Sequence, residues 1–322
     1  AWLELEQDAQ DALYVRVDRK KKLCITVLLR ALGFGSNRAI EDLFPGDKII
    51  SETLKKDTTR SEVDGLIELY RRLRPGEVPT EDSVRQHLYN LFFDPRRYDI
   101  AKVGRYKYNK KLNLAYRLPG CKASEPIVNP ETGEIIVQAG EKISEAQAKE
   151  IQNAGVNEVF VLVDDAEEGE IKHKIIANNT VDFSAVSDIP LRARAKDFGL
   201  LPTIYYPNYR FSKVIAADCA EMTVEEVAEK YVDELDALYY TQEKPEEADE
   251  KQEEKKNREK RRDNRRKFVQ ACKTFHAVLS RENPVPTKEE KKEIRPLADK
   301  LCHKHITVDD IVASISTNLD LK

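Results

Sequence analysis

Near its start the chain changes from apolar residues at every second position to apolar residues at helical spacing. Residues 2–6 and 13–17 alternate apolar and polar side chains around a polar connection, which predicts a β-hairpin because successive side chains of a strand point to opposite faces. A strand that enters a helix is expected over residues 23–32. Helical spacing recurs within residues 40–43, 64–73 and 82–93, and Thr80 is placed to cap the last of these helices. Residues 1–115 are therefore predicted to form a compact α+β region.

The part that follows has a different pattern. Two short apolar runs flank the Thr132-Gly133 turn, which predicts a pair of strands. A short helix is expected over residues 144–154. Further strands are expected over 158–163, 172–176 and 202–206, and a further helix over 224–239. We therefore predict a small β-rich module that is followed by helical structure.

Opposite charges are segregated into two adjacent blocks further along the chain. Residues 243–254 contain seven acidic residues and two lysines, whereas residues 255–267 contain nine basic and two acidic residues. Such blocks are typical of a solvated face or a tether. Glu247 and Lys251 stand four residues apart in the orientation that favours a helix, and apolar residues at helical spacing continue through 268–279. We expect one charged helix whose C-terminal half packs onto the protein.

The composition narrows the class of protein. At 322 residues, with 40% apolar and 35% charged residues, the chain is expected to be soluble and to form two or three domains. It has no apolar run of about 18 residues and no secretory signal, so we expect a cytosolic protein without a membrane partner. The five cysteines are scattered and form no Cys-x-x-Cys pair. They are therefore expected to be reduced thiols.

The ends of the chain and its charge distribution are also informative. The chain opens in the first predicted strand without an initiator methionine and stops after an apolar helical pattern at 311–321, so we expect a piece of a longer polypeptide. Residues 1–120 contain 23 basic and 18 acidic residues, whereas residues 121–322 contain 31 and 40. The first part is the better candidate to face a polyanion.

No catalytic motif is evident. Gly33-Phe-Gly35 is too short for a phosphate loop and lacks the lysine that follows such loops. Cys302, His303 and His305 could hold a metal, but histidines two residues apart lie on different faces of a helix. Clustered aspartates that would hold catalytic magnesium are also lacking. We therefore expect binding rather than catalysis, with any magnesium held outside this chain.

Basic residues are clustered in the first part of the chain, and three tyrosines (98, 106 and 108) accompany the third cluster. The clusters comprise Arg16 with Arg19 and Lys20–Lys22, then Arg71, Arg72 and Arg74, then the seven basic residues between Arg96 and Lys111. Such groups can neutralise phosphates, and an exposed aromatic ring such as Trp2 can stack on an unpaired base. The same charge density is also common on solvated surfaces, so composition alone leaves both interpretations open.

Four longer strings carry a resemblance to a known family. They are Trp2-Leu-Glu-Leu-Glu with Leu13-Tyr-Val-Arg-Val-Asp-Arg-Lys-Lys-Lys, Ile50-Ser-Glu-Thr-Leu-Lys-Lys-Asp, Tyr70-Arg-Arg-Leu-Arg-Pro-Gly-Glu-Val-Pro-Thr, and Leu91-Phe-Phe-Asp-Pro-Arg-Arg-Tyr-Asp-Ile-Ala-Lys-Val-Gly-Arg-Tyr-Lys-Tyr-Asn-Lys-Lys-Leu. In this order they strongly resemble the β2 or lobe region of the bacterial RNA polymerase β subunit. Ile306-Thr-Val-Asp-Asp-Ile-Val-Ala-Ser-Ile looks like the helix that follows there, and 129–143 is similar to a barrel-sandwich insertion of Gram-positive β subunits.

The resemblance implies a domain organisation. We expect a mixed helical and antiparallel α+β lobe from residues 1–118 together with 306–322. An inserted, small β-rich and barrel-sandwich-like module would occupy 119–240, and a charged helical segment of the insertion would occupy 241–305.

The resemblance also implies a function. A lobe forms one wall of the downstream DNA channel and helps to hold the non-template strand, without a catalytic centre or a cofactor of its own. The parent enzyme is a magnesium-dependent nucleotidyltransferase of the bacterial cytoplasm and nucleoid. The expected partners are downstream duplex and non-template DNA, and the β′, α and sigma subunits. By position in the motifs, Trp2 would stack on an unpaired non-template base, and Asp18, Arg19 and Arg74 would line the neighbouring pocket.

Each assignment has an alternative. Trp2 could instead cover the hydrophobic face of the hairpin, Asp18 and Arg19 could pair within their turn, and Arg74 could cap the helix that ends before Pro75. The insertion could instead be a protein-docking module for a regulator or for another polymerase subunit, since alternating charge blocks suit partner helices.

Overall fold

The structure is a computed structural model that describes residues 1–186, 195–240 and 251–320. The chain divides into two compact units. Unit 1 comprises Ala1–Asn178 and Lys304–Lys322, and unit 2 comprises Asn179–His303. Each unit has its own hydrophobic core, so each is described by itself.

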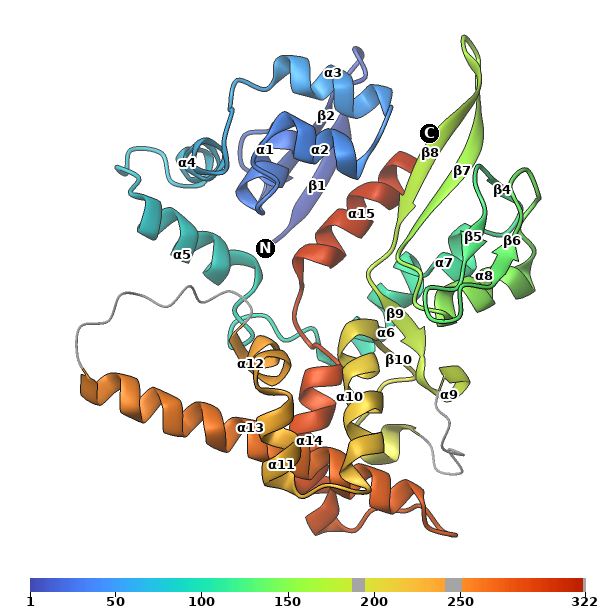
Figure 1. Cartoon of the computed structure of the whole chain (residues 1–322). Coiled ribbons are helices and arrows are strands. Elements are labelled where there is room, and N and C mark those ends of the chain that lie inside the picture. The colour runs from blue at the N-terminus through green and yellow to red at the C-terminus, as the bar shows by residue number, and fades with distance from the viewer. Residues whose placement is uncertain (187–194, 241–250, 321–322) are drawn as a thin grey trace. The chain divides into compact units, whose positions relative to one another are not determined.

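Unit 1 begins with an antiparallel sheet of three strands in the order β1-β2-β3 (Figure 1). Leu3 pairs with Val17 and Gln7 with Leu13, so the predicted hairpin is confirmed. One face of β2 is buried at alternate residues, as the sequence pattern requires. The elements of this part are β1 (Leu3–Gln7), β2 (Leu13–Val17), β3 (Leu23–Cys24), α1 (Ile25–Ala31), α2 (Asn37–Leu43), α3 (Lys48–Lys56), α4 (Glu62–Leu73) and α5 (Glu81–Phe92).

Side-chain caps fix where α2, α3, α4 and α5 begin, whereas α1 starts without one. The hydroxyl of Ser61 accepts a hydrogen bond from the backbone N–H of Asp64, and this satisfies a donor that the first turn of α4 leaves free. At α5, Thr80 and Ser83 form a reciprocal capping box, which confirms the predicted cap. The starts of these four capped helices are therefore encoded locally.

Arg30 of α1 forms a buried ion pair with Asp57, which follows α3. Arg30 and Asp57 are both fully buried, and Arg30 Nε donates to Asp57 Oδ2 at 3.2 Å. The hydroxyl of Thr26 donates to the same oxygen at 2.6 Å, and the backbone N–H of Thr59 donates to the other at 2.8 Å. Burial raises the pKa of Asp57, but the donors from Thr26, Thr59 and Arg30 outweigh burial and lower the pKa below its ordinary value.

This pKa shift predicts a pH dependence of stability. A carboxylate whose pKa is lower in the folded state stabilises the fold above its unfolded pKa of about 3.9, and the contribution is lost as pH falls through the folded pKa. The difference in unfolding free energy between the unmodified chain and Asp57→Asn should therefore be constant above about pH 5 and shrink below about pH 4. Urea unfolding from pH 7 to pH 3 measures it, with Asp42→Asn on the surface as control. A difference that does not change over this range would contradict the prediction.

The rest of unit 1 combines short helices with two small antiparallel sheets, β4-β7-β8 and β5-β6. The core of this part is formed by residues of α7, α8 and the strands. Figure 1 shows that α15 runs beside β8, although residues 177–307 separate them in sequence. The elements are α6 (Ala101–Leu112), α7 (Leu114–Arg117), β4 (Lys122–Ala123), β5 (Ile127–Val128), β6 (Ile135–Val137), α8 (Glu145–Asn153), β7 (Glu158–Asp165), β8 (Gly169–Ile176) and α15 (Val308–Asp320).

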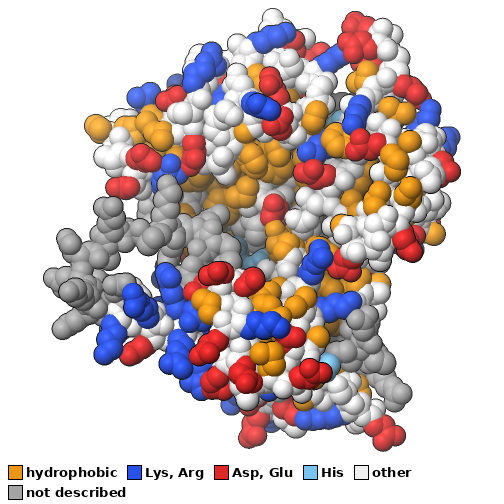
Figure 2. Space-filling view, in the orientation of Figure 1, with side chains coloured by type: hydrophobic (Ala, Val, Ile, Leu, Met, Phe, Trp, Pro, Cys, Tyr) orange, Lys and Arg blue, Asp and Glu red, His pale blue; other side chains and the backbone are white. Residues whose placement is uncertain are grey.

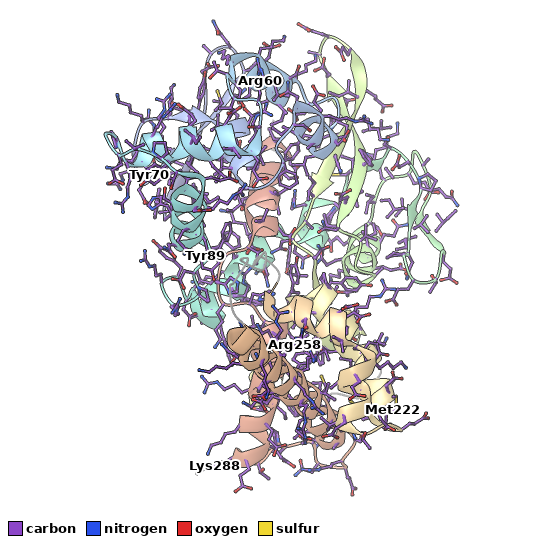
Figure 3. All side chains as sticks on the ribbon, turned by 60° about the vertical axis from the view of Figure 1, so that its left-hand side comes forward. Arg60, Tyr70, Tyr89, Met222, Arg258 and Lys288 are labelled. Atoms are coloured by element: carbon purple, nitrogen blue, oxygen red, sulfur yellow. The ribbon has the colours of Figure 1, made fainter. Side chains whose placement is uncertain are left out.

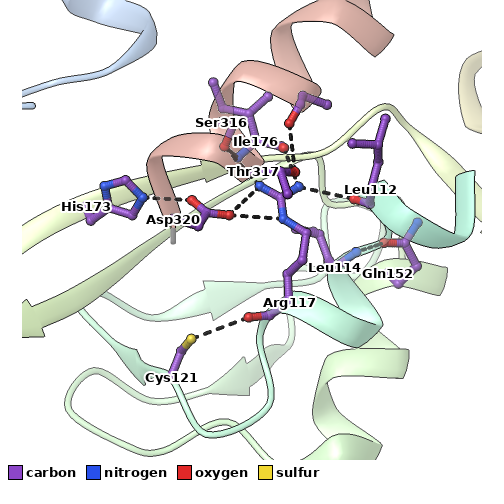
Figure 4. A network of polar contacts seen from close by, with 11 residues as sticks. Leu112, Leu114, Arg117, Cys121, Gln152, His173, Ile176, Ser316, Thr317 and Asp320 are labelled. Carbon is purple, nitrogen blue, oxygen red and sulfur yellow. Dashed lines mark hydrogen bonds and ion pairs between the residues drawn. The ribbon is translucent and has the colours of Figure 1, made fainter. Parts of the chain in front are cut away.

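Arg117 joins α15 to the elements around it (Figure 4). Its Nη2 donates to Asp320 Oδ2 at 2.6 Å and to Ser316 Oγ at 2.9 Å, and its Nη1 donates to the carbonyl of Ile176 at 2.6 Å. His173 Nε2 lies 2.8 Å from the other oxygen of Asp320. One arginine therefore connects α7, β8 and α15.

Unit 2 is mainly helical around its own core, and Phe268, Cys272 and Phe275 of its longest helix are buried there. Among its described residues, β10 and β9 form a sheet of two antiparallel strands. Phe268 stacks on Phe211 with ring centroids 6.2 Å apart. The elements are β9 (Thr180–Asp182), α9 (Phe183–Val186), η1 (Ala195–Phe198), β10 (Thr203–Tyr205), α10 (Tyr206–Cys219), α11 (Val224–Lys230), α12 (Val232–Tyr240), α13 (Lys251–Leu279) and α14 (Lys288–Leu301).

These elements confirm the predicted α+β class, and none of the sheets of the described residues closes into a barrel. The charged helix over 251–279 is also confirmed, and its C-terminal half packs into the core of unit 2. The acidic residues 243–250 lie outside the described residues. The helix predicted over 224–239 is wrong in one respect, because it is interrupted at Tyr231, which has non-helical dihedrals. The division into 1–118 with 306–322, 119–240 and 241–305 stays a prediction.

Candidate nucleic-acid interface

Trp2 and Asp18 are joined at one end of the β1–β2 hairpin. The backbone N–H of Trp2 donates to Asp18 Oδ1 at 2.7 Å, and the backbone N–H of Asp18 donates to the carbonyl of Trp2 at 2.8 Å. Asp18 and Arg19 both have left-handed backbone dihedrals, with φ of +49° and +59°. Two consecutive non-glycine residues in this region are uncommon, and the hydrogen bonds to Trp2 help to hold the turn.

The Trp2 side chain is 63% exposed, so the alternative in which it covers the hydrophobic face of the hairpin is not what the structure has. An exposed indole has a free ring face and an N–H donor. Such a ring can stack on an unpaired base, and stacking tolerates any base because every base has a π face.

Arg19 extends from the same turn, and its side chain is 83% exposed. Its nearest acidic neighbour is Glu4, at 4.0 Å from Nε, so the pair is weak and solvated. Lys20 and Lys21 are also exposed. Asp18 accepts from Trp2 rather than pairing with Arg19. The turn thus carries three cationic side chains, and it is hydrogen-bonded to the backbone of Trp2, which is exposed.

Arg74 belongs to a different element from Trp2, Asp18 and Arg19. It is the C-cap residue of α4, and its backbone N–H donates to the carbonyl of Tyr70 at 2.7 Å. Its guanidinium lies 3.2 Å from Glu77, which also accepts a hydrogen bond from the Tyr70 hydroxyl at 2.5 Å. The hydrogen bonds from Tyr70 and Arg74 lower the pKa of Glu77. Figure 3 shows Tyr70 on α4, close to the loop of residues 74–80 that follows this helix. The structure therefore gives Arg74 a role at the end of α4, while half of its side chain stays exposed.

Several other basic residues of the clusters are already paired. Arg105 is buried, and both Nη atoms of its guanidinium donate to the Asp310 carboxylate at 2.9 Å. Arg72 pairs with Glu68 at 2.9 Å. The Nε atoms of Arg96 and Arg97 lie 3.5 and 3.8 Å from the carboxylate oxygens of Asp94. Arg105 is therefore a structural residue, which its place in a basic cluster did not indicate.

Negative charge gathers elsewhere in unit 1. Acidic side chains crowd the tip of the β7–β8 hairpin, at the upper right of Figure 2, where Asp164, Glu167 and Glu168 are exposed. Lys48 reaches three carboxylates of this tip at 3.1 to 3.8 Å. A polyanion is expected to avoid this tip.

The cysteines and histidines show no sign of site chemistry. Within the described residues no group of three or more His, Cys, Asp or Glu side chains could hold a metal ion. Burial raises the pKa of Cys24 and of Cys219 to about 11, so neither is a reactive thiolate at neutral pH. His303 Nε2 lies 3.1 Å from the amide nitrogen of Asn208. Among the described residues, none of the helices is both long and apolar enough to cross a membrane.

Comparison with known proteins supports the family resemblance that the four sequence strings indicate. Residues 1–119 match the family RNA polymerase Rpb2, domain 2. The chain is 50% identical over 210 residues to the DNA-directed RNA polymerase subunit beta of Clostridioides difficile, a match that covers 65% of this chain and 16% of that protein. It is 52% identical over 188 residues to the subunit of Acetivibrio thermocellus, covering 58% and 15%. For Clostridium acetobutylicum the identity is 42% over 234 residues, covering 73% and 17%.

These matches define the class as a domain of a multi-subunit RNA polymerase. More narrowly, the chain belongs to the family of DNA-directed RNA polymerase β subunits, with domain 2 of that family over residues 1–119. The chain spans about one sixth of the length of the curated relatives it matches.

Proposed function

We propose that this chain is the lobe region of a β subunit and contributes to transcription by forming a wall of the downstream DNA channel. In this proposal the turn at Asp18 and Arg19 holds non-template DNA, with Trp2 stacked on an unpaired base. Nucleotidyl transfer, and the magnesium it uses, belong to parts of the polymerase outside this chain. The remaining partners would be downstream duplex DNA and the β′, α and sigma subunits, in the bacterial cytoplasm and nucleoid.

One observation supports the proposal above the others. Trp2 is 63% exposed while its backbone is held to Asp18 by two hydrogen bonds, so the ring is presented from a defined position rather than buried. Arg19 on the same turn can contact a phosphate or a guanine edge, and Asp18 can accept from a base amine with its second oxygen. In this proposal Arg74 is an additional DNA contact. Its half-exposed guanidinium pairs with Glu77 and would have to leave Glu77 to bind DNA.

The proposal predicts the effect of Trp2→Ala on DNA affinity. Stacking on one base is worth about 1–3 kcal/mol, so binding of the chain to a DNA duplex with an unpaired bubble should weaken by roughly fivefold or more, while binding to fully paired duplex stays nearly unchanged. Fluorescence anisotropy at low salt measures both. Tyr89→Ala is the matched control, since Tyr89 is a 36% exposed ring on α5 (Figure 3). Equal losses for Trp2→Ala and Tyr89→Ala would argue against the assignment.

A second candidate function is protein docking by unit 2. An open cavity of about 620 Å³ lies between α11, α13 and α14. Its charged lining includes Glu225, Arg266, Lys292 and Glu293, and its apolar lining includes Val224. A partner with alternating charges would fit this lining. If docking is the function, Arg266→Glu with Lys292→Glu should abolish retention of purified polymerase subunits on the immobilised chain and leave bubble binding unchanged. Retention that survives both changes would exclude this cavity.

A further inference from the structure

Helix α6 turns a cationic face to solvent. Its sequence contains no acidic residue, and its buried side consists of Arg105, Asn109 and Leu112. At about 100° per residue, Val103, Lys107, Lys110 and Lys111 lie on the side opposite these three, and Tyr106 lies at the edge of that side. We call the exposed Val103, Tyr106, Lys107, Lys110 and Lys111, together with Tyr116 of α7, the α6 face.

Among the residues that the structure describes, the lysines of the α6 face have no acidic partner. The ion pair that α6 forms with Asp310 involves the buried Arg105 instead. Lys107 and Lys111 are four residues apart on this helix, and like charges at this spacing destabilise it. Lys110 and Lys111 lie in the last turn of α6, where the helix dipole favours cations, so the fold gains only a small stabilisation from these charges. Their common feature is that a polyanion could contact all of them at once.

Two aromatic rings stand among the lysines. Tyr106 is 42% exposed and Tyr116 is 66% exposed, and the Lys110 ammonium lies 5.6 Å from the centre of the Tyr116 ring. Tyr116 contributes little to the core, because most of its surface stays in water. A ring with a free face beside a cation is suited to stacking on a base whose phosphate the cation neutralises.

We propose that the α6 face binds single-stranded nucleic acid, with the lysines on phosphates and Tyr106 and Tyr116 on unpaired bases. A protein partner fits less well, because lysine is depleted from protein interfaces and the α6 face has no apolar centre larger than Val103. Lysines are point charges without base selectivity, so the surface is expected to be tolerant of sequence. None of Trp2, Asp18, Arg19 and Arg74 belongs to this face. The inference therefore goes beyond the proposed function and does not depend on it.

The test uses the whole 322-residue chain and a labelled oligothymidine in fluorescence anisotropy over a range of salt concentrations. Lys107→Gln with Lys110→Gln should weaken binding. The negative slope of log affinity against log salt should become less steep by about 1.4, since each phosphate contact on a single strand contributes about 0.7. Tyr116→Ala should weaken binding roughly fivefold or more and leave the slope unchanged. All measurements are repeated in a Trp2→Ala background, where the same losses are expected.

The control is Lys288→Gln with Lys291→Gln on α14, which removes the same charge from exposed positions three residues apart (Figure 3). It should leave affinity and slope nearly unchanged. The inference is overturned if the α6 variant behaves like this control, or if its losses disappear in the Trp2→Ala background. It is also overturned if an acidic peptide binds as tightly as the oligothymidine and Tyr116→Ala affects neither. Circular dichroism checks that the variants are folded.

Discussion

Arg105→Ala should lower the free energy of unfolding by about 3–5 kcal/mol, because it leaves a buried carboxylate without its partner. Arg105 and Asp310 are 6% and 2% exposed in their side chains, and two hydrogen bonds of 2.9 Å join them. Asp310 also accepts from the backbone N–H of Thr307 at 2.9 Å. Loss of the pair would therefore loosen α15 from α6. Urea unfolding measures the change, and hydrogen exchange at α15 locates it.

Two variants make this prediction specific. Arg105→Lys keeps the charge but cannot form both bonds, so its loss should be smaller. Arg85→Ala removes a partly exposed arginine that pairs with Glu62 and with Glu81, and pairs this close to solvent are worth about 0–1 kcal/mol each. If Arg105→Ala costs no more than Arg85→Ala, the pair does not hold α15 in place.

Gly65→Ala should cost about 1–3 kcal/mol, even though alanine is the better helix former. Gly65 lies inside α4 where this helix crosses α1. A Cβ at Gly65 would stand 2.7 Å from Arg30 Cβ and 3.0 Å from the Val27 carbonyl oxygen, so the helices would have to separate. The separation would also disturb the buried Arg30–Asp57 pair.

The control for this prediction is Gly104→Ala in α6. Its Cβ would lie 3.2 Å from Ile100 Cβ, a side chain of the preceding turn rather than another helix. Relief of the helix penalty of glycine, about 1 kcal/mol, should make this variant neutral or more stable. Thermal unfolding of both variants compares them. A Gly65→Ala chain as stable as the unmodified one would show that α1 and α4 can move apart without cost.

The elements that the sequence predicted well are those whose signal is local. The β1–β2 hairpin follows from alternation, and α5 follows from its periodicity and from the Thr80 cap. Helices α6, α10 and α14 were not predicted as helices. In α6 the buried face includes Arg105 and Asn109, so its apolar periodicity is weak. In α14 an internal proline, Pro296, resembles a stop signal although the helix continues through it.

The candidate site was predictable in part. Motif position singled out Trp2, Asp18 and Arg19, and the structure brings these three to one turn, whereas it places Arg74 at the end of α4 with Glu77. Whether these residues contact DNA stays a prediction. The sequence could not separate Arg105 from the lysines around it, because its partner Asp310 is 205 residues away. Tyr116 drew no attention, since its exposure depends on how α7 follows α6.

The central claim is that Trp2 stacks on an unpaired base, and the fluorescence of this residue tests it most directly. Trp2 is the only tryptophan in the chain, so its emission reports this one position without labels or substitutions. Titration with bubble DNA at low salt should quench the emission in parallel with binding measured by anisotropy, and fully paired duplex should quench it much less. If bubble DNA binds while the emission of Trp2 stays the same, the ring does not stack and the claim is contradicted.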